Sequence, residues 1–224
     1  LPKGVDVAGV AGHDVAGGVG VEVADGQTLH LGEHFVPDGF LCALADRNHQ
    51  KLLQEGSYHT AAKDTGNADL FKEQMREIGI CVLEGENCVY EINGEKINLC
   101  GIDDPTRGIE TMQLDAAFSG IDENLYTILL AHRPERFEIY QNYPADLVVC
   151  GHAHGGQWRI PGVLNGFYAP NQGFFPEFDM GLYEKNGTAM LVSRGVGNSI
   201  IPIRIHNRPE IILAELKVSV GISE

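Results

Sequence analysis

Two histidines stand close together in the stretch Leu147-Val-Val-Cys-Gly-His152-Ala-His154. The apolar run from Leu147 to Cys150 is rich in β-favouring residues and predicts a buried strand. Gly151 is expected to take a sharp turn at the strand end, because glycine has no Cβ to clash. His152 and His154 then follow at spacing i, i+2. Since imidazole suits zinc, iron and related ions, the stretch by itself fits a metal site and a polar surface loop equally well.

Ligand-type side chains follow two further runs that read as strands. Tyr126 to Ala131 is apolar and is followed by His132, and Phe40 to Ala45 is followed by Asn48-His49. Neighbouring strands that both end in histidine place three imidazoles along the carboxyl edge of one sheet, the edge where α/β proteins bind ligands. The sequence therefore predicts one site assembled from several strand ends.

Composition narrows the class of protein. A chain of 224 residues with 43% hydrophobic residues and a mean hydropathy of -0.10 is expected to form a single globular domain over residues 1–224. No apolar run reaches the roughly 18 residues of a membrane span. The formal net charge of -15 argues against nucleic-acid binding. The five cysteines form no Cys-x-x-Cys pair, which argues against a disulfide framework or a structural zinc.

The chain begins at Leu1 rather than at methionine. We expect that a segment upstream of it has been removed or is not represented, and a signal or membrane anchor is one kind of segment that would fit. With an anchor, membrane contact would come through that segment, and the protein would be membrane-associated or in the cell envelope. Otherwise it would be cytoplasmic. The oligomeric state is left open.

Strand-like and helix-like runs together predict an α/β sandwich. The expected strands are 5–11, 19–23, 40–45, 89–92, 96–100, 126–131, 147–150, 181–183, 189–193 and 211–216. The expected helices are 67–78, 113–118 and 135–141. Asn93-Gly94 and Asn186-Gly187 are typical of tight hairpin turns, and Asp103 and Asp104 are expected to pair with arginine or backbone groups.

Residues 1–50 are unusual for this class. Only about ten residues separate Asp14 from Asp25, which is too few for a crossover between neighbouring parallel strands. Either the strands are joined in another way, or a helix has been lost from this sequence. We favour the second explanation.

Beyond the histidines, the chain becomes rich in Gly, Pro and aromatic residues, from Trp158 to Phe178. A long irregular segment of this kind lines a substrate cleft. It serves equally well as a hydrophobic lid over the core, and both interpretations stay open.

Several motifs together resemble the calcineurin-like metallophosphoesterases, in particular a bacterial branch whose catalytic domain follows a signal or membrane anchor. The resemblance is strong over residues 67–217 and implies a four-layer αββα sandwich of two mixed β-sheets. The motifs are Asn48-His49, Ala131-His132, Gly151-His152-Ala-His154, Ser193-Arg-Gly-Val-Gly197, Pro202-Ile-Arg204 and Arg208-Pro-Glu210.

In such enzymes two divalent cations, here Mn, Fe or Zn, clamp a phosphate while a metal-bound hydroxide attacks phosphorus in line. The resemblance implies hydrolysis of a phosphomonoester or phosphodiester, either a small molecule or a lipid-linked one. It implies that His132, His152 and Asn48 ligate the second metal and that His154 ligates the first. His49 would contact the phosphate or protonate the leaving group.

Two aspartates complete the implied ligand set. Asp14 takes the place of the aspartate in the family's Asp-x-His motif, and Asp25 that of the bridging aspartate. Ala16, Ala24 and Thr28 stand where the family has His, Gly and a second acid. An alternative register lays Thr28 to Gly32 over the Asp-Leu-His motif. We prefer the first register, because it keeps the strand order and the distance from Leu1.

Two other functions were weighed. A metallo-β-lactamase-type hydrolase requires His-x-His-x-Asp-His, and Gly155-Gly156-Gln157 follows His154 instead. The stronger rival is a protein of the phosphoesterase fold that lacks the first metal and binds its ligand without cutting it.

Overall fold

A computed structural model describes residues 5–13, 19–23, 27–31, 44–45, 73, 76, 81–92, 95–104, 110–195 and 203–218. For the strands within residues 5–45, it describes the backbone alone. The elements, in chain order, are β1 (Val5–His13), β2 (Val19–Val23), β3 (Gln27–Leu31), β4 (Leu44–Ala45), β5 (Glu86–Ile92), β6 (Glu95–Gly101), α3 (Glu110–Ala117), β7 (Tyr126–Leu130), η2 (Pro134–Arg136), α4 (Phe137–Tyr140), β8 (Leu147–Cys150), η3 (His154–Gly156), β9 (Tyr168–Ala169), β10 (Gly173–Phe174), β11 (Gly181–Lys185), β12 (Thr188–Val192) and β13 (Ile211–Val218).

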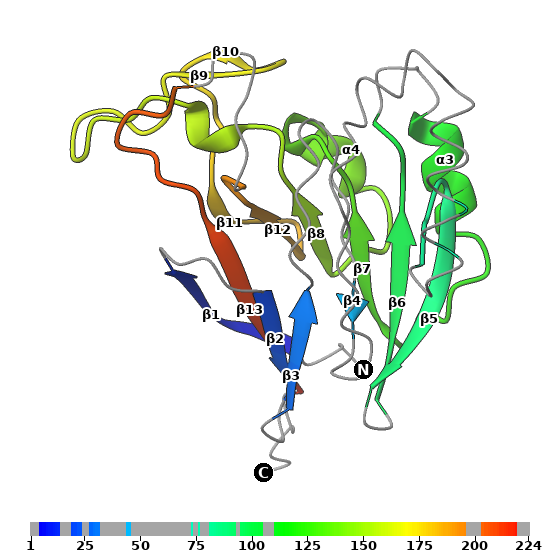
Figure 1. Cartoon of the computed structure of the whole chain (residues 1–224). Helices are drawn as coiled ribbons and strands as arrows, with labels where there is room; N and C mark the ends of the chain where they lie inside the picture. Colours follow the sequence, from blue (N-terminus) through cyan, green and yellow to red (C-terminus); the bar gives the residue numbers. More distant parts are fainter. Residues whose placement is uncertain are drawn as a thin grey trace.

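The described strands form an α/β structure with mixed sheets (Figure 1). The larger sheet has six strands in the order β11-β12-β8-β7-β6-β5. Its four inner strands, β12, β8, β7 and β6, are parallel, and the outer strands β11 and β5 pair antiparallel with their neighbours. The carboxyl ends of the four inner strands therefore meet at one edge of this sheet.

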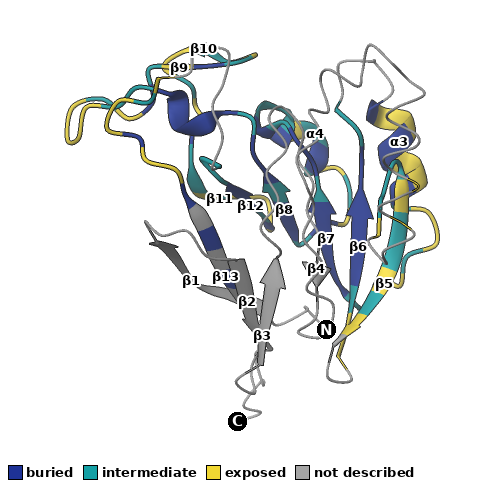
Figure 2. Cartoon of the chain, viewed as in Figure 1, coloured by how far each residue is buried: buried dark blue, intermediate teal, exposed yellow. Residues whose placement is uncertain are grey.

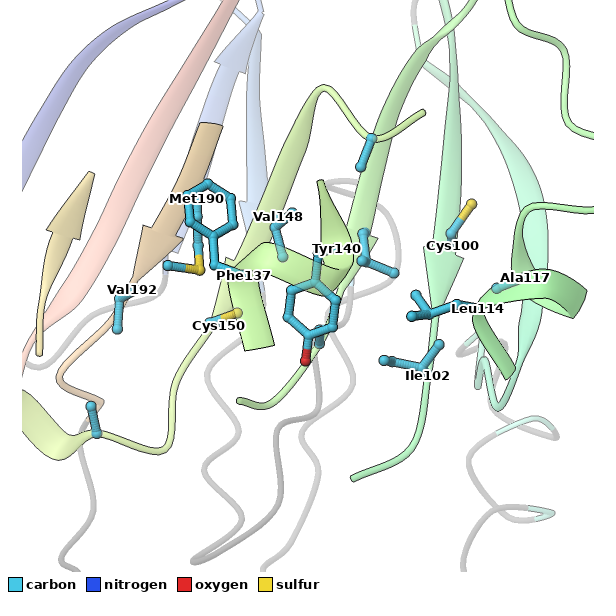
Figure 3. Packing of buried hydrophobic residues seen from close by; sticks show 14 of the residues in the cluster. Cys100, Ile102, Leu114, Ala117, Phe137, Tyr140, Val148, Cys150, Met190 and Val192 are labelled. Atoms are coloured by element: carbon cyan, nitrogen blue, oxygen red, sulfur yellow. The ribbon is translucent and has the colours of Figure 1, made fainter. Parts of the chain in front are cut away.

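Helices cover one face of the six-stranded sheet. Alternate residues of a strand point to opposite faces, so Val148 and Cys150 of β8 join Phe137 and Tyr140 of α4 in one buried cluster (Figure 3). Leu114 of α3 belongs to the same cluster. Figure 2 shows that burial is greatest along the inner strands, with β6 and β7 buried over most of their length. Strands buried on both faces read as continuous apolar runs, which is why 126–131 and 147–150 stood out in the sequence.

The opposite face packs against a second sheet. That sheet has five strands in the order β1-β13-β2-β3-β4. Ile212 and Ala214 of β13 share a buried cluster with Leu99, Ile128 and Leu191 of the six-stranded sheet. The two sheets are thus joined through an apolar layer at β13.

The strand directions resolve the short spacing near the start of the chain. β1 and β2 are not neighbours, because β13 lies between them, antiparallel to β1 and parallel to β2. His13 at the end of β1 pairs with Ile211, and Val23 at the end of β2 pairs with Leu216. Strands that run in opposite directions need no helical crossover. β1 and β2 are therefore not parallel neighbours. The loss of a helix from this stretch stays a prediction.

Most of the predicted elements are confirmed. Ile92 pairs with Glu95, so a two-residue loop closes the β5–β6 hairpin. Asn186 and Gly187 both have positive φ, at 53° and 85°, as the β11–β12 turn requires. The predicted helix 135–141 begins as the 3₁₀ turn η2 and continues as α4. Of the predicted helix 67–78, the described residues Glu73 and Arg76 are helical.

Strand β3 and the short β9–β10 ribbon were not predicted. β9 and β10 have two residues each, too few for a periodic pattern, and β3 alternates polar and apolar residues only from Thr28 to Leu31. Within the described residues, none of the helices has the length and apolar character required to cross a bilayer.

Replacing Leu114 by alanine tests the helix-covered face. Leu114 lies on α3 and its side chain is fully buried. The change should therefore lower the free energy of unfolding by about 2–5 kcal/mol, measured by urea denaturation. The control is Met112→Ala on the same helix, where the side chain is 64% exposed and the change should stay within about 0.5 kcal/mol. Equal losses for the two variants would contradict this packing.

Candidate metal-binding site at the carboxyl edge of the sheet

Polar side chains stand at the same position after each of the four parallel strands. Asp103, His132, His152 and Arg194 each lie two residues beyond the last residue of β6, β7, β8 and β12 respectively. Backbone hydrogen bonds continue past the strand ends, from Ala131 N to Val149 O at 3.1 Å and from Gly151 N to His132 O at 3.2 Å. The sheet register therefore holds these side chains in a row along one edge.

His132 and His152 lie together, as the sequence predicted. Their ring centroids are 4.5 Å apart, with an angle of 62° between the ring planes. Gly151 N donates to His132 O, so the loop before one histidine is fixed to the backbone of the other. The two imidazoles are brought together by adjacent parallel strands and not by closeness in the chain.

His132 is buried and electrically neutral. Burial first, and the neighbouring His152 second, lower its pKa from 6.5 to about 3. Both of its ring nitrogens are inaccessible to solvent and have no hydrogen-bond partner among the residues that the structure describes. A buried polar atom without a partner is costly, and a neutral imidazole is the form that binds a metal. These features fit a metal ligand.

His152 is oriented by a residue from the aromatic segment. Its Nε2 lies 2.7 Å from Oδ1 of Asn171. A side-chain carbonyl oxygen only accepts, so this contact assigns the proton of a neutral His152 to Nε2 and leaves the lone pair on Nδ1. A partner of this kind on the second ring nitrogen is what holds metal-binding histidines in position.

The turn that carries His152 and His154 has an unusual backbone. His152, His154 and Gln157 have positive φ values of 63°, 47° and 56°, and Gly155 and Gly156 are positive as well. The chain turns tightly at Gly151, where Ala153 N donates to Gly151 O at 2.7 Å, and the positive φ values begin one residue later, at His152. Non-glycine residues in this region cost of order 1–3 kcal/mol and gather at functional sites.

Distant segments hold this turn in place. Asn207 Nδ2 donates to the carbonyl oxygens of His154, at 2.6 Å, and of Gln157, at 3.1 Å. A Cβ on Gly155 would lie 2.4 Å from Oδ1 of Asn207, and one on Gly156 would lie 2.2 Å from Cα of Gly166. Both glycines are therefore required by close packing as well as by φ.

His154 is buried beside an arginine. Nη2 of Arg204 donates to Arg194 O at 2.9 Å and lies 3.4 Å from Nδ1 of His154. Arg194 forms an ion pair with Glu210. His154 also lies close enough to His132 to contribute to its lowered pKa. The third predicted histidine thus belongs to the same edge and stands in a positively charged setting.

Acidic groups also lie near the histidine pair. Asp104 accepts from Nε of Arg133 at 2.9 Å, which confirms the predicted pairing of this acid with arginine. Glu135 lies 3.7 Å from Arg133, and burial raises the pKa of its carboxyl group while His152 opposes that rise. Glu135 was not predicted as a site residue, although the run His132-Arg-Pro-Glu135 contained it.

The described residues supply part of a metal site. Two imidazoles meet at the sheet edge, but among the described side chains no group of three or more His, Cys, Asp or Glu is arranged to hold a metal ion. Asp14, Asp25, Asn48 and His49 lie outside the described residues. Their proposed roles stay predictions.

Asp14 follows β1 and Asp25 follows β2 in the sequence, so the positions of these two strand ends matter for the proposed metal ligands. β1 ends opposite Ile211 and β2 ends opposite Leu216, so these two strand ends lie at different positions along β13. Five residues of strand separate the two positions, or roughly 17 Å at about 3.3 Å per residue.

Three residues of the site were missed in the sequence. Asn171 and Asn207 are lone asparagines in irregular segments, and no local pattern distinguishes them from turn residues. Arg204 was quoted only as part of a motif. Asn171 contacts His152 across 19 residues of sequence, Asn207 contacts His154 across 53, and Arg204 contacts Arg194 across 10. Only the fold reveals these contacts.

Comparison with known proteins points to one family. Over 185 residues the chain is 29% identical to the uncharacterized metallophosphoesterase YkuE of Bacillus subtilis. The aligned residues make up 81% of this chain and 57% of the relative. Over 158 residues it is 32% identical to the phosphodiesterase YaeI of Escherichia coli. The aligned residues make up 70% of this chain and 55% of the relative. Over 126 residues it is 32% identical to the UDP-2,3-diacylglucosamine pyrophosphatase LpxG of Chlamydia trachomatis, with 53% of this chain and 37% of the relative covered.

The chain spans a little over half the length of the first two of these relatives. No protein-family model and no solved structure matches it. The named relatives and the histidines that end two adjacent parallel strands agree with the resemblance seen in the sequence. The chain belongs to the calcineurin-like metallophosphoesterase family.

Proposed function

We propose that this chain is a metal-dependent phosphoesterase that hydrolyses a phosphomonoester or a phosphodiester. The observation that carries the proposal is the pair His132 and His152 at the carboxyl edge of the sheet. His132 is neutral and buried, and no described residue gives its ring nitrogens a hydrogen bond. A metal ion would give its ring nitrogen the partner that burial denies it.

The site is proposed to be binuclear, with Mn, Fe or Zn as the metals. His132, His152 and Asn48 would hold one ion, His154 and Asp14 the other, and Asp25 would bridge them. This arrangement requires the chain beyond the ends of β1 and β2 to bring Asp14 and Asp25 together. When bound, the two ions would neutralise charge on the phosphoryl oxygens and activate a water for in-line attack. This donor set suits such ions, because imidazole and carboxylate are the ligands that first-row divalent metals accept.

The protein's own groups would position the reaction. Asn171 holds His152 with its Nδ1 lone pair available. Arg204 adds positive charge beside His154, at the edge where a phosphate dianion would lie. His49 is proposed to contact the phosphate or to give a proton to the leaving group.

The finer fold assignment also belongs to this proposal. We propose the four-layer αββα sandwich of the family. Three layers are supported by described residues, namely helices α3 and α4, the six-stranded sheet, and the five-stranded sheet that meets it at β13. A second helical layer would come from outside the described residues.

The substrate is proposed to be a small-molecule or lipid-linked phosphate ester. One relative, LpxG, is named for a diacylated sugar nucleotide, which supports the lipid-linked kind. The second candidate function is a phosphoesterase-fold binding protein without the first metal. Ala16, Ala24 and Thr28, which stand where the family has His, Gly and a second acid, are the reason to keep this candidate.

Metal binding tests the histidine pair directly. Adding Mn²⁺ or Zn²⁺ to metal-free protein should raise its melting temperature, because a ligand that binds only the folded state stabilises it. His132→Ala and His152→Ala should each remove the rise, measured by differential scanning fluorimetry. His206→Asn is the control, since His206 is exposed and asparagine tolerates its positive φ of 48°. An unchanged rise in both alanine variants would contradict the site.

Turnover separates the two candidate functions. Metal-loaded protein should hydrolyse bis(p-nitrophenyl) phosphate and should contain two metal equivalents by mass spectrometry. The binding protein would contain one equivalent or none and show no turnover. His152→Ala should abolish turnover while leaving the circular dichroism spectrum unchanged. Anomalous-scattering peaks beside His132, His152 and His154 would locate the ions.

Asn171→Ala tests the positioning of His152. Loss of its hydrogen bond should lower turnover or metal affinity by roughly 10–100-fold. The matched control is Asn165→Ala, an exposed asparagine of the same irregular segment, which should keep full activity. Equal effects of the two substitutions would show that Asn171 does not act through His152.

A further inference from the structure

Two thiols lie close together at the start of the outer strand β5. The thiol of Cys81 donates to Sγ of Cys88, with 3.2 Å between the two sulfur atoms. Cys88 is the third residue of β5, the strand at the right of Figure 1, and Cys81 lies in the segment that leads into it. A disulfide joins sulfurs about 2.05 Å apart, so each sulfur would move by only about 0.6 Å to form one.

The other cysteines that the structure describes are out of reach of this pair. Cys100 and Cys150 are fully buried in the helix-covered cluster. Cys88 pairs with Leu99 across the β5–β6 hairpin, and both belong to the cluster between the two sheets. Neighbouring residues of a strand point to opposite faces, so Cys100 lies on the other face of the sheet. Cys81 and Cys88 are thus the described thiols that solvent can reach.

A surface pocket gives a small molecule access to Cys81. The pocket has a volume of about 510 Å³, and its lining includes Arg76, Cys81 and Leu83. Cys81 is exposed, whereas Cys88 is half-buried. Burial, and then the adjacent Cys81 thiol, raise the pKa of Cys88 to about 12, which keeps Cys88 protonated at neutral pH. Because the thiolate is the nucleophile, Cys81 is the thiol that reacts first.

We propose that Cys81 and Cys88 form a reversible disulfide by exchange with a small-molecule disulfide such as oxidised glutathione. The Cys81 thiolate attacks one sulfur of glutathione disulfide, that S–S bond breaks, and one glutathione thiolate leaves. The sulfur of Cys88 then attacks Cys81 in the mixed disulfide, and the second glutathione thiolate leaves. The two cysteine protons end on the two glutathiones, so two cysteine thiols are oxidised and one glutathione disulfide is reduced.

A metal ion fits the pair less well than a disulfide. Among the side chains that the structure describes, no group of three or more His, Cys, Asp or Glu is arranged to hold a metal ion. Structural zinc takes four ligands, whereas a disulfide needs two sulfurs alone. A single bridge of this kind is distinct from the disulfide framework that the sequence argues against.

The bridge would fasten a segment that supports the end of β6. A Cβ on Gly101 would lie 2.5 Å from Cβ of Leu83, and Gly85 N donates to Gly101 O at 2.9 Å. Gly85 also packs against Gln113, whose side chain bonds to the chain just beyond β6. The bridge would close residues 81–88 into a ring around these contacts. The redox state would therefore set how firmly this segment is held.

Cleavage after glutamate tests the bridge directly. Glu84 and Glu86 lie between the two cysteines, so a glutamate-specific protease separates Cys81 from Cys88 unless a disulfide joins them. Folded protein equilibrated in glutathione redox buffer, blocked with N-ethylmaleimide and digested without reductant should give the two peptides as one linked mass. Reduction should release them. The linked fraction should rise with the ratio of glutathione disulfide to glutathione and fall when that ratio is lowered.

Serine variants separate this bridge from general thiol oxidation. Cys81→Ser should give no linked peptides, and Cys88→Ser should trap a stable glutathione adduct on Cys81. Cys42→Ser is the control and should form the bridge as the unchanged protein does. His152→Ala should also form it, so failure of the phosphoesterase proposal would leave this test intact.

The bridge should also stabilise the folded protein. A disulfide restricts the unfolded chain, so the bridged protein should melt roughly 5–10 °C above the reduced protein in differential scanning fluorimetry. Cys81→Ser should melt at the same temperature in the oxidising and the reducing buffer.

Four outcomes would overturn the proposal. Cys81 and Cys88 could stay as thiols in the oxidising buffer, or a glutathione adduct on Cys81 could persist without being displaced by Cys88. Either cysteine could pair with Cys42 instead. A bridged protein that melts below the reduced protein would show that the fold holds the two sulfurs apart.

Discussion

The parallel pairing of β6, β7, β8 and β12 is the constraint on which the candidate site depends. In a parallel sheet all carboxyl ends lie at one edge, and the register fixes how far each strand reaches. Here each strand is followed, two residues later, by Asp103, His132, His152 or Arg194. His132 and His152 are 20 residues apart in sequence, and adjacent strands reduce that separation to contact.

Packing on the helix-covered face has a second consequence at this edge. Phe137 and Tyr140 close the sheet behind Val148 and Cys150, and this dense layer extends to the loop that carries His132. Burial there disfavours a charged imidazole, so the pKa of His132 falls to about 3. The same hydrophobic packing that stabilises the fold thus keeps a candidate ligand in its metal-binding form.

The turn that follows β8 shows how separate segments share the work of forming a site. Its backbone has positive φ at His152, His154 and Gln157, a conformation that the turn's own sequence does not favour. Asn207 holds two of its carbonyl groups, Gly166 packs against Gly156, and Asn171 holds the ring of His152. The strain is therefore offset by contacts from chain 10 to 53 residues away.

By itself, the sequence determined the strands that end at His132 and His152, both hairpins and the family, because apolar runs, Asn-Gly turns and spaced histidines are local signals. It did not determine that β13 separates β1 from β2, which reverses their relative direction. Nor did it single out Asn171, Asn207 or Arg204, whose roles arise from contacts across the chain. Strand order and side-chain partners are set by which buried surfaces match in three dimensions, and only the tertiary structure decides that.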